Sequence, residues 1–140
     1  MNAIDSNFAA ILAREVPDHE RLHMLPKHFG RDMLTVESAI FAFMRKLCAG
    51  YSGGWWTYYE LSNQGFYMAP RGEALYAVTV DGNDFSGDLS ADAAGITACL
   101  FALSHLSFRV HSDKIGEHFH LLRDFALEHP EASSILAAID

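Results

Sequence analysis

Three residues near the N-terminus have the types and spacing of a zinc protease site. His19, Glu20 and His23 fit the pattern HExxH. On a helix, this spacing places both histidines on one face to bind zinc, with the glutamate as general base. However, Pro17 precedes the motif and Pro26 follows it closely, which leaves little room for a helix. A small zinc hydrolase is therefore kept only as an alternative.

Other reactive side chains are not spaced for catalysis. Cys48 and Cys99 lack a CxxC partner and lie in apolar helical patterns, which favours buried free thiols over a disulfide. Ser86 lacks the GxSxG context of a nucleophile elbow. His118 and His120 flank one residue of an expected helix and so point to different faces. The eight histidines are interpreted as polar surface positions, and we predict a protein that is not an enzyme and uses no metal or cofactor.

Length and charge narrow the class of protein. The chain has 140 residues, of which half are hydrophobic, so one domain spanning residues 1–140 with its own core is expected. No apolar run is long enough to cross a bilayer, and residues 1–20 lack the features of a signal peptide. We therefore expect a cytoplasmic protein. The chain has ten basic and eighteen acidic residues. Because DNA-binding surfaces need basic residues to contact the phosphates, we do not expect direct DNA binding.

The acidic residues are concentrated in one part of the chain. Residues 72–108 contain no lysine or arginine and five acids, which are Glu73, Asp81, Asp84, Asp88 and Asp92. Such a stretch is most simply a solvated face. It is also a patch that could attract a basic partner or imitate DNA phosphates, although a DNA mimic would carry denser negative charge.

The helices that must position these residues are visible in the apolar periodicity. Ser6 is a candidate cap for a first helix, and Thr35 for a second one that runs to about Cys48. Residues 22–30 have the composition of a turn or connector. Ser90 is a candidate cap for a helix over residues 91–108, which is apolar on most sides and is expected to be the central core helix. Two further helices are expected over residues 113–129 and 130–139.

An aromatic stretch over residues 53–70 predicts a β-hairpin. Its strands are expected at residues 55–61 and 65–69, around a turn at residues 62–65, and a third strand is expected at residues 75–80. The fold class is therefore α+β, with a small antiparallel sheet of about three strands and four to five helices. Neighbours in a strand point to opposite faces, so Trp55 and Trp56 cannot both face one core. We expect Trp56 to be the exposed one.

Three segments resemble the antirestriction protein family of the ArdB/KlcA type. They are RLHMLPKHFG at residues 21–30, GGWWTYYELSNQGFYMAP at residues 53–70 and LSADAAGI at residues 89–96, followed by the apolar helix and the ending AAID. The resemblance covers residues 21–140, whereas residues 1–20 carry no family pattern. Gln64 stands where glycine is common in the family.

The resemblance implies a function in which incoming DNA is protected against type I restriction–modification enzymes. It also implies a compact α+β fold without a cofactor. The expected partner is the restriction enzyme or an accessory host protein. The separate ArdA group resembles a DNA mimic and is heavily acidic, so an acidic mimic is the second alternative. The expected contact residues, none of them catalytic, are Arg21, Glu37, Trp56, Asp84, Asp88 and Asp140.

Overall fold

An antiparallel hairpin of large side chains forms the centre of the first sheet. In the computed structural model, which describes residues 9–140, strand β2 (Trp56–Leu61) pairs with β3 (Phe66–Pro70). At the turn, the Gly65 amide donates a hydrogen bond to the side-chain oxygen of Asn63 at 2.9 Å. The Asn63 amide group in turn donates to the backbone oxygen of Leu121 at 2.9 Å, which ties the turn to a distant helix. The predicted hairpin is confirmed.

A short strand near the N-terminus completes this sheet. Strand β1 (Ala13–Glu15) pairs with the outer edge of β2 and gives the order β1-β2-β3. The expected N-terminal helix is therefore wrong over the described residues, while its candidate cap Ser6 lies outside them. The edge of β2 presents unpaired backbone groups, and pairing with β1 satisfies them. Local apolar periodicity does not report such a long-range pairing.

The third predicted strand belongs to a second sheet. Strand β4 (Leu75–Val80) pairs with β5 (Phe85–Ser90), and these two strands form a separate antiparallel ribbon. The sequence did not indicate β5, because Ser86, Gly87 and Asp88 are poor strand formers. The α+β class is confirmed, but the single three-stranded sheet that the pattern suggested is in fact two sheets.

A long apolar helix lies at the centre of the molecule, as predicted. Helix α4 (Ala91–Ser107) begins at Ser90, whose hydroxyl oxygen accepts a hydrogen bond from the Ala93 amide at 3.1 Å. It packs against β3 through Gly95, where a Cβ atom would lie 2.5 Å from the Cα of Ala69. Only a glycine permits this close approach of helix and strand.

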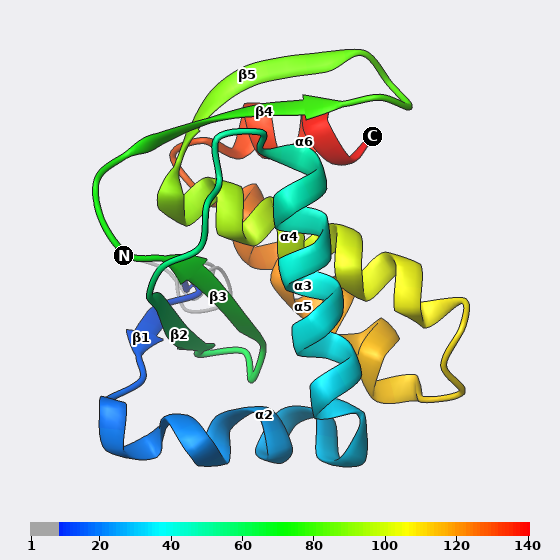
Figure 1. Ribbon diagram of the computed structural model, residues 1–140. Coiled ribbons are helices and arrows are strands. Elements are labelled where there is room, and N and C mark those ends of the chain that lie inside the picture. The colour runs from blue at the N-terminus through cyan, green and yellow to red at the C-terminus, as the bar shows by residue number, and fades with distance from the viewer. Residues whose placement is uncertain (1–8) are drawn as a thin grey trace, which may run out of the picture.

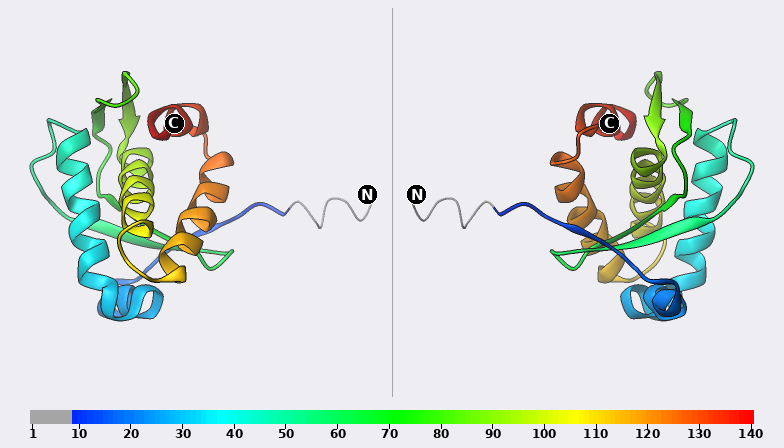
Figure 2. Two further views of the ribbon diagram at one scale, coloured as in Figure 1. Left: turned by 90° about the vertical axis from the view of Figure 1, so that its right-hand side faces the viewer. Right: turned by 90° about the vertical axis from the view of Figure 1, so that its left-hand side faces the viewer.

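Three further α-helices pack against α4 in the described part of the chain. Helix α3 (Met33–Leu47) and helix α5 (Asp113–Leu127) pack on its two sides, and α6 (Ala132–Ile139) covers one end (Figures 1 and 2). Helix α3 begins at Met33, so Asp32 and not the expected Thr35 occupies the cap position, and its side chain makes no cap hydrogen bond. This difference of three residues is typical of predicted helix ends.

Residues 21–29 form a helix and not the expected connector. Helix α2 (Arg21–Phe29) follows a short 3₁₀ turn, η1 (Asp18–Glu20), and a second one, η2 (Gly30–Asp32), leads into α3. Its inward face buries Met24, Leu25, His28 and Phe29. This burial stabilises the helix although Pro26 removes one backbone hydrogen bond from it. Within residues 9–140, no helix is both long and apolar enough to cross a membrane.

Candidate functional site

Two of the predicted contact residues meet around one tyrosine. The Arg21 guanidinium lies over the ring of Tyr58, 4.6 Å from its centroid. The Tyr58 hydroxyl donates a hydrogen bond to the Glu37 carboxylate at 3.1 Å. Burial and the neighbouring Glu37 raise the pKa of Tyr58, so its hydroxyl keeps the proton that it donates. Strand β2 thus brings together residues from α2 and α3 that are sixteen positions apart (37 − 21 = 16).

The expectation that Trp56 is the exposed tryptophan is wrong. Trp56 is 3% exposed, whereas Trp55 is 74% exposed. The Trp56 indole donates a hydrogen bond to the Tyr51 hydroxyl at 2.9 Å and meets the ring of Phe41 edge-on, with the centroids 5.1 Å apart. The sequence predicts that the two tryptophans face opposite sides. Helix α3 decides which of them is buried, because its Phe41 covers the side that carries Trp56.

The exposed tryptophan lines a groove next to Arg21. We call this the tryptophan groove; it has a volume of about 570 Å³ and is lined by Asp18, Arg21, Leu22, Trp55, Tyr58 and Arg71. Leu22 is 88% exposed, which makes it the second large apolar side chain that is left uncovered there. Asp18 pairs with Arg71 at 3.0 Å and with Arg21 at 3.7 Å. Two arginines and one aspartate leave the groove with a small positive charge.

The predicted acidic contact residues lie in another part of the molecule. Asp84 is in the β4–β5 turn and Asp88 is on β5, and both are exposed. Asp140, also exposed, follows α6. The neighbouring Asn83 joins the turn to α6 through hydrogen bonds to the backbone oxygens of residues 137 and 138. Figure 1 shows this end of the molecule opposite to α2, so the six predicted residues do not form one surface.

Asp92, the last acid of the predicted patch, takes part in a half-buried hydrogen-bond network. Its carboxylate accepts a hydrogen bond from the Tyr67 hydroxyl at 2.7 Å and lies 2.8 Å from the His129 ring. Burial alone would raise the pKa of Asp92, but the hydrogen bonds to His129 and Tyr67 hold it below its usual value. The carboxylate therefore ties α4 to β3 and to the segment after α5, while 37% of the Asp92 side chain stays exposed.

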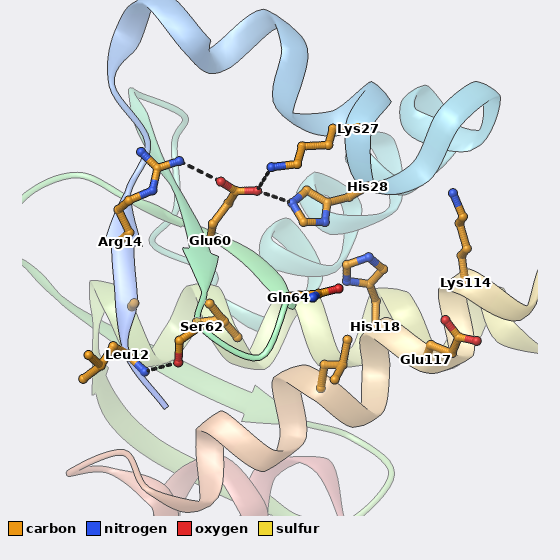
Figure 3. Close-up of a pocket in the computed structure, with 13 residues that line it drawn as sticks. Leu12, Arg14, Lys27, His28, Glu60, Ser62, Gln64, Lys114, Glu117 and His118 are labelled. Atoms are coloured by element: carbon orange, nitrogen blue, oxygen red, sulfur yellow. Dashed lines mark hydrogen bonds and ion pairs between the residues drawn. The ribbon is translucent and has the colours of Figure 1, made fainter. Parts of the chain in front are cut away.

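A larger cavity lies between α2, α5 and the edge of the first sheet (Figure 3). We call it the histidine pocket; its volume is about 890 Å³, and its charged and polar lining includes Arg14, Lys27, His28, Glu60, Lys114, Glu117 and His118. The buried rings of His28 and His118 meet edge-on with their centroids 5.0 Å apart. The interpretation of all histidines as surface positions is therefore wrong for these two.

One carboxylate connects three elements at the wall of this pocket. Glu60 on β2 accepts hydrogen bonds from Arg14 of β1 at 2.7 Å and from Lys27 of α2 at 2.8 Å, and it lies 2.8 Å from the His28 ring. Burial alone would raise the pKa of Glu60, but these three hydrogen bonds lower it to about 2. Glu60 is thus ionised at any physiological pH. Sequence reasoning missed it because its partners are 32 to 46 residues away.

The two buried histidines are shifted toward their neutral forms. Burial lowers the pKa of His28, and the neighbouring Glu60 opposes this shift without cancelling it. Burial, together with the charges of His28 and Lys114, lowers the pKa of His118 to about 4. The Nδ1 atom of His118 is buried and has no hydrogen-bond partner among residues 9–140. No feature of the sequence distinguished His118 from the exposed His120 as the buried member of the pair.

The HExxH residues do not lie on one regular helix. His19 and Glu20 belong to the 3₁₀ turn η1, whereas His23 is on α2, and both histidines are exposed. His19 and Glu20 contact each other at 3.6 Å. Over the described range 9–140, no three His, Cys, Asp or Glu side chains are grouped to hold a metal ion. Cys48 and Cys99 are buried free thiols, as predicted, and burial raises their pKa values to about 11 and about 12.

Known proteins resemble this chain over most of its length. A family model described as "Antirestriction protein" matches residues 49–140. Two Escherichia coli proteins named antirestriction protein KlcA are 47% and 45% identical to the chain. The first alignment covers 93% of this chain and 94% of that KlcA, and the second covers both chains fully.

A solved structure matches the fold as well as the sequence. It superimposes with a TM-score of 0.87 at 45% identity and covers 94% of this chain and 96% of the other. That work describes the KlcA and ArdB proteins as having a novel fold and antirestriction activity against type I DNA restriction systems in vivo but not in vitro.

Proposed function

Because the chain belongs to the antirestriction protein family of the KlcA/ArdB type, we propose that it protects incoming DNA against type I restriction systems. The single observation that carries this proposal is the identity of 45–47% to KlcA over at least 93% of the chain. We further propose that protection works through contact with a protein and not through catalysis.

The tryptophan groove is the proposed contact surface. Tryptophan, tyrosine and arginine are the side chains that most often dominate the binding energy of protein interfaces, and this groove contains Trp55, Tyr58 and Arg21. Arg21 was a predicted contact residue, and Trp55 takes the role expected of Trp56. The packing of Arg21 on Tyr58 holds both side chains in place before binding, which lowers the entropy lost on association.

The partner is proposed to be the restriction enzyme or an accessory host protein. The related KlcA and ArdB proteins were described as active in vivo but not in vitro. Such a difference is expected when the cell supplies a component that a purified assay lacks. The small positive charge of the groove favours a partner segment with an apolar anchor and an acidic residue beside it.

The acidic surface supports a DNA mimic less well. Asp92 bonds to Tyr67 and His129, and the exposed predicted acids at this end are Asp81, Asp84, Asp88 and Asp140. A mimic must present negative charges at the density of a DNA backbone, about one per 1.7 Å of helix axis. The acids are therefore proposed mainly to keep the surface solvated.

The test is the plating efficiency of unmodified phage on cells that carry a type I restriction system. We expect the wild-type chain and Glu20→Gln to relieve restriction equally, because neither zinc nor a general base is required. A variant with Asp84→Asn and Asp88→Asn is expected to retain protection. Loss of protection in Glu20→Gln would support a hydrolase, and loss in the aspartate variant would support a mimic. No protection by abundant, folded wild-type protein would overturn the proposed function.

A further inference from the structure

We propose that the histidine pocket binds a small organic monocarboxylate, with its apolar body against the leucines of the wall and its carboxylate head between Lys114 and His118. This ligand site is independent of the tryptophan groove and of the proposed antirestriction function.

The size and the wall of the pocket fit a small amphipathic molecule. Its volume of about 890 Å³ lies within the range of 300–1,000 Å³ that is typical of small-molecule sites. Leu12, Leu61 and Leu121 line it alongside the charged residues. A combination of an apolar wall and a few convergent polar groups is the usual composition of such sites.

The charge of the pocket is opposite to that of the chain. The whole sequence has ten basic and eighteen acidic residues, whereas the pocket lining has three basic residues, Arg14, Lys27 and Lys114, and two acidic ones, Glu60 and Glu117. The lining therefore has a net charge of +1 with neutral histidines (3 − 2 = 1). One negative charge on a ligand would balance it, which favours a carboxylate over a doubly charged phosphate.

The cation that faces the ligand is Lys114. Arg14 and Lys27 both donate hydrogen bonds to Glu60, so each already has a carboxylate partner. Lys114 makes no ion pair within residues 9–140. Figure 3 shows it on α5 together with His118, on the opposite side of the pocket from Arg14.

His118 supplies the second polar contact. The residue is 7% exposed, it lines the pocket, and its Nδ1 atom has no partner among the described residues. A neutral imidazole has one N–H donor and one acceptor nitrogen, and either kind of nitrogen is unfavourable when it is buried without a partner. A carboxylate oxygen in the pocket provides an acceptor for this ring while it pairs with Lys114.

The test is an NMR titration of ¹⁵N-labelled full-length protein with sodium octanoate, which combines a carboxylate with an apolar chain. We expect saturable shifts of the His118 ring and of the amides of Ser62 and Gln64, with a Kd on the order of 0.1–1 mM. Octanol has the same chain without the charge, and inorganic phosphate has the charge without the chain. Both are expected to bind at least about tenfold more weakly than octanoate, a difference of about 1.4 kcal/mol.

Matched variants locate the carboxylate head. Lys114→Met and His118→Phe are each expected to weaken octanoate binding about tenfold. Lys46→Met makes the same change on α3, outside the pocket, and is expected to leave Kd within about twofold. A thermal melt shows whether each variant is folded. The proposal is overturned if octanoate shifts do not saturate, if octanol or phosphate binds equally well, or if Lys114→Met binds octanoate like Lys46→Met.

Discussion

Trp55 and Trp56 are adjacent in the chain but have opposite environments, since 74% of Trp55 is exposed and only 3% of Trp56. The Trp56 ring is held between α3 and the loop before the hairpin by its contacts with Phe41 and Tyr51. Trp55 lies at the tryptophan groove without such cover. The two indoles therefore allow binding and stability to be separated by single substitutions.

Trp55→Ala is expected to abolish or strongly reduce relief of restriction while the free energy of unfolding changes by less than about 0.5 kcal/mol. An exposed side chain contributes little to the core, but a tryptophan anchor contributes much to an interface. Plating efficiency and denaturant unfolding measure the two effects. Phe108→Ala is the control, because Phe108 is 88% exposed and lies outside the groove. Full protection by Trp55→Ala at wild-type abundance would exclude the groove as the contact surface.

Trp56→Ala is expected to lower the free energy of unfolding by about 3–5 kcal/mol, because it leaves a large cavity next to Phe41 and Tyr51. Any loss of protection should then follow the loss of folded protein. Urea unfolding followed by circular dichroism measures the change. If Trp56→Ala had wild-type stability and still lost protection, Trp56 would be a contact residue after all.

Gly95→Ala is expected to destabilise the protein by roughly 1–3 kcal/mol, despite the better helix propensity of alanine. The new Cβ would lie 2.5 Å from Ala69, so α4 and β3 would have to move apart. Gly116→Ala on α5 is the matched control, since its Cβ meets no atom within 4 Å. That control should be neutral or stabilised by up to about 1 kcal/mol. Equal effects at the two positions in thermal melts would contradict the close packing of α4 on β3.

Gln64→Gly is expected to stabilise the protein by about 1 kcal/mol. Gln64 has a φ of 75° in the hairpin turn, a left-handed conformation that costs a side-chain-bearing residue more than glycine. Gln64→Ala keeps the Cβ atom and should not produce this gain. A melting temperature that is equal in Gln64→Gly and Gln64→Ala would contradict the strain argument.

Acidification is expected to destabilise the fold partly through His118. Its pKa is lowered from 6.5 to about 4 in the folded state, so the unfolded chain takes up the proton first. The stabilising contribution is present above pH 6.5 and is lost as the pH falls toward 4. The maximal loss is about 3 kcal/mol for a shift of this size. His118→Phe should flatten the stability curve in this window. An unchanged slope in urea unfolding from pH 7 to pH 4 would contradict the buried neutral ring.

Glu60 is expected to affect the stability of the fold at a lower pH than His118 does. Its pKa is lowered from 4.5 to about 2, so its stabilising contribution is present above pH 4.5 and is lost as the pH falls toward 2. Glu60→Gln should be less stable at pH 7, because Arg14 and Lys27 lose their charged partner, and should lose less stability below pH 4.5. Urea unfolding of both proteins between pH 7 and pH 2 measures this. Parallel curves would contradict the bonding of Glu60 to its three partners.

The sequence alone determined those features that depend on neighbouring residues. The hairpin of residues 56–70, the cap at Ser90 and the apolar helix α4 follow from turn chemistry and periodicity, which act over a few positions. The three matching segments also indicated the family, which the identity to KlcA confirms. Arg21 was chosen as a contact residue only through that resemblance, and its position over the Tyr58 ring came from the structure.

Only the tertiary structure decided the features that join distant segments. Strand β1 pairs with β2 across about 46 residues, and Glu60 draws its partners from β1 and α2. The alternation of Trp55 and Trp56 was evident, but the packing of α3 selected the face that became buried. The burial of His28 and His118 likewise depends on α2 and α5 meeting at the sheet edge. Such contacts arise from the joint packing of several elements, and no single segment of sequence encodes them.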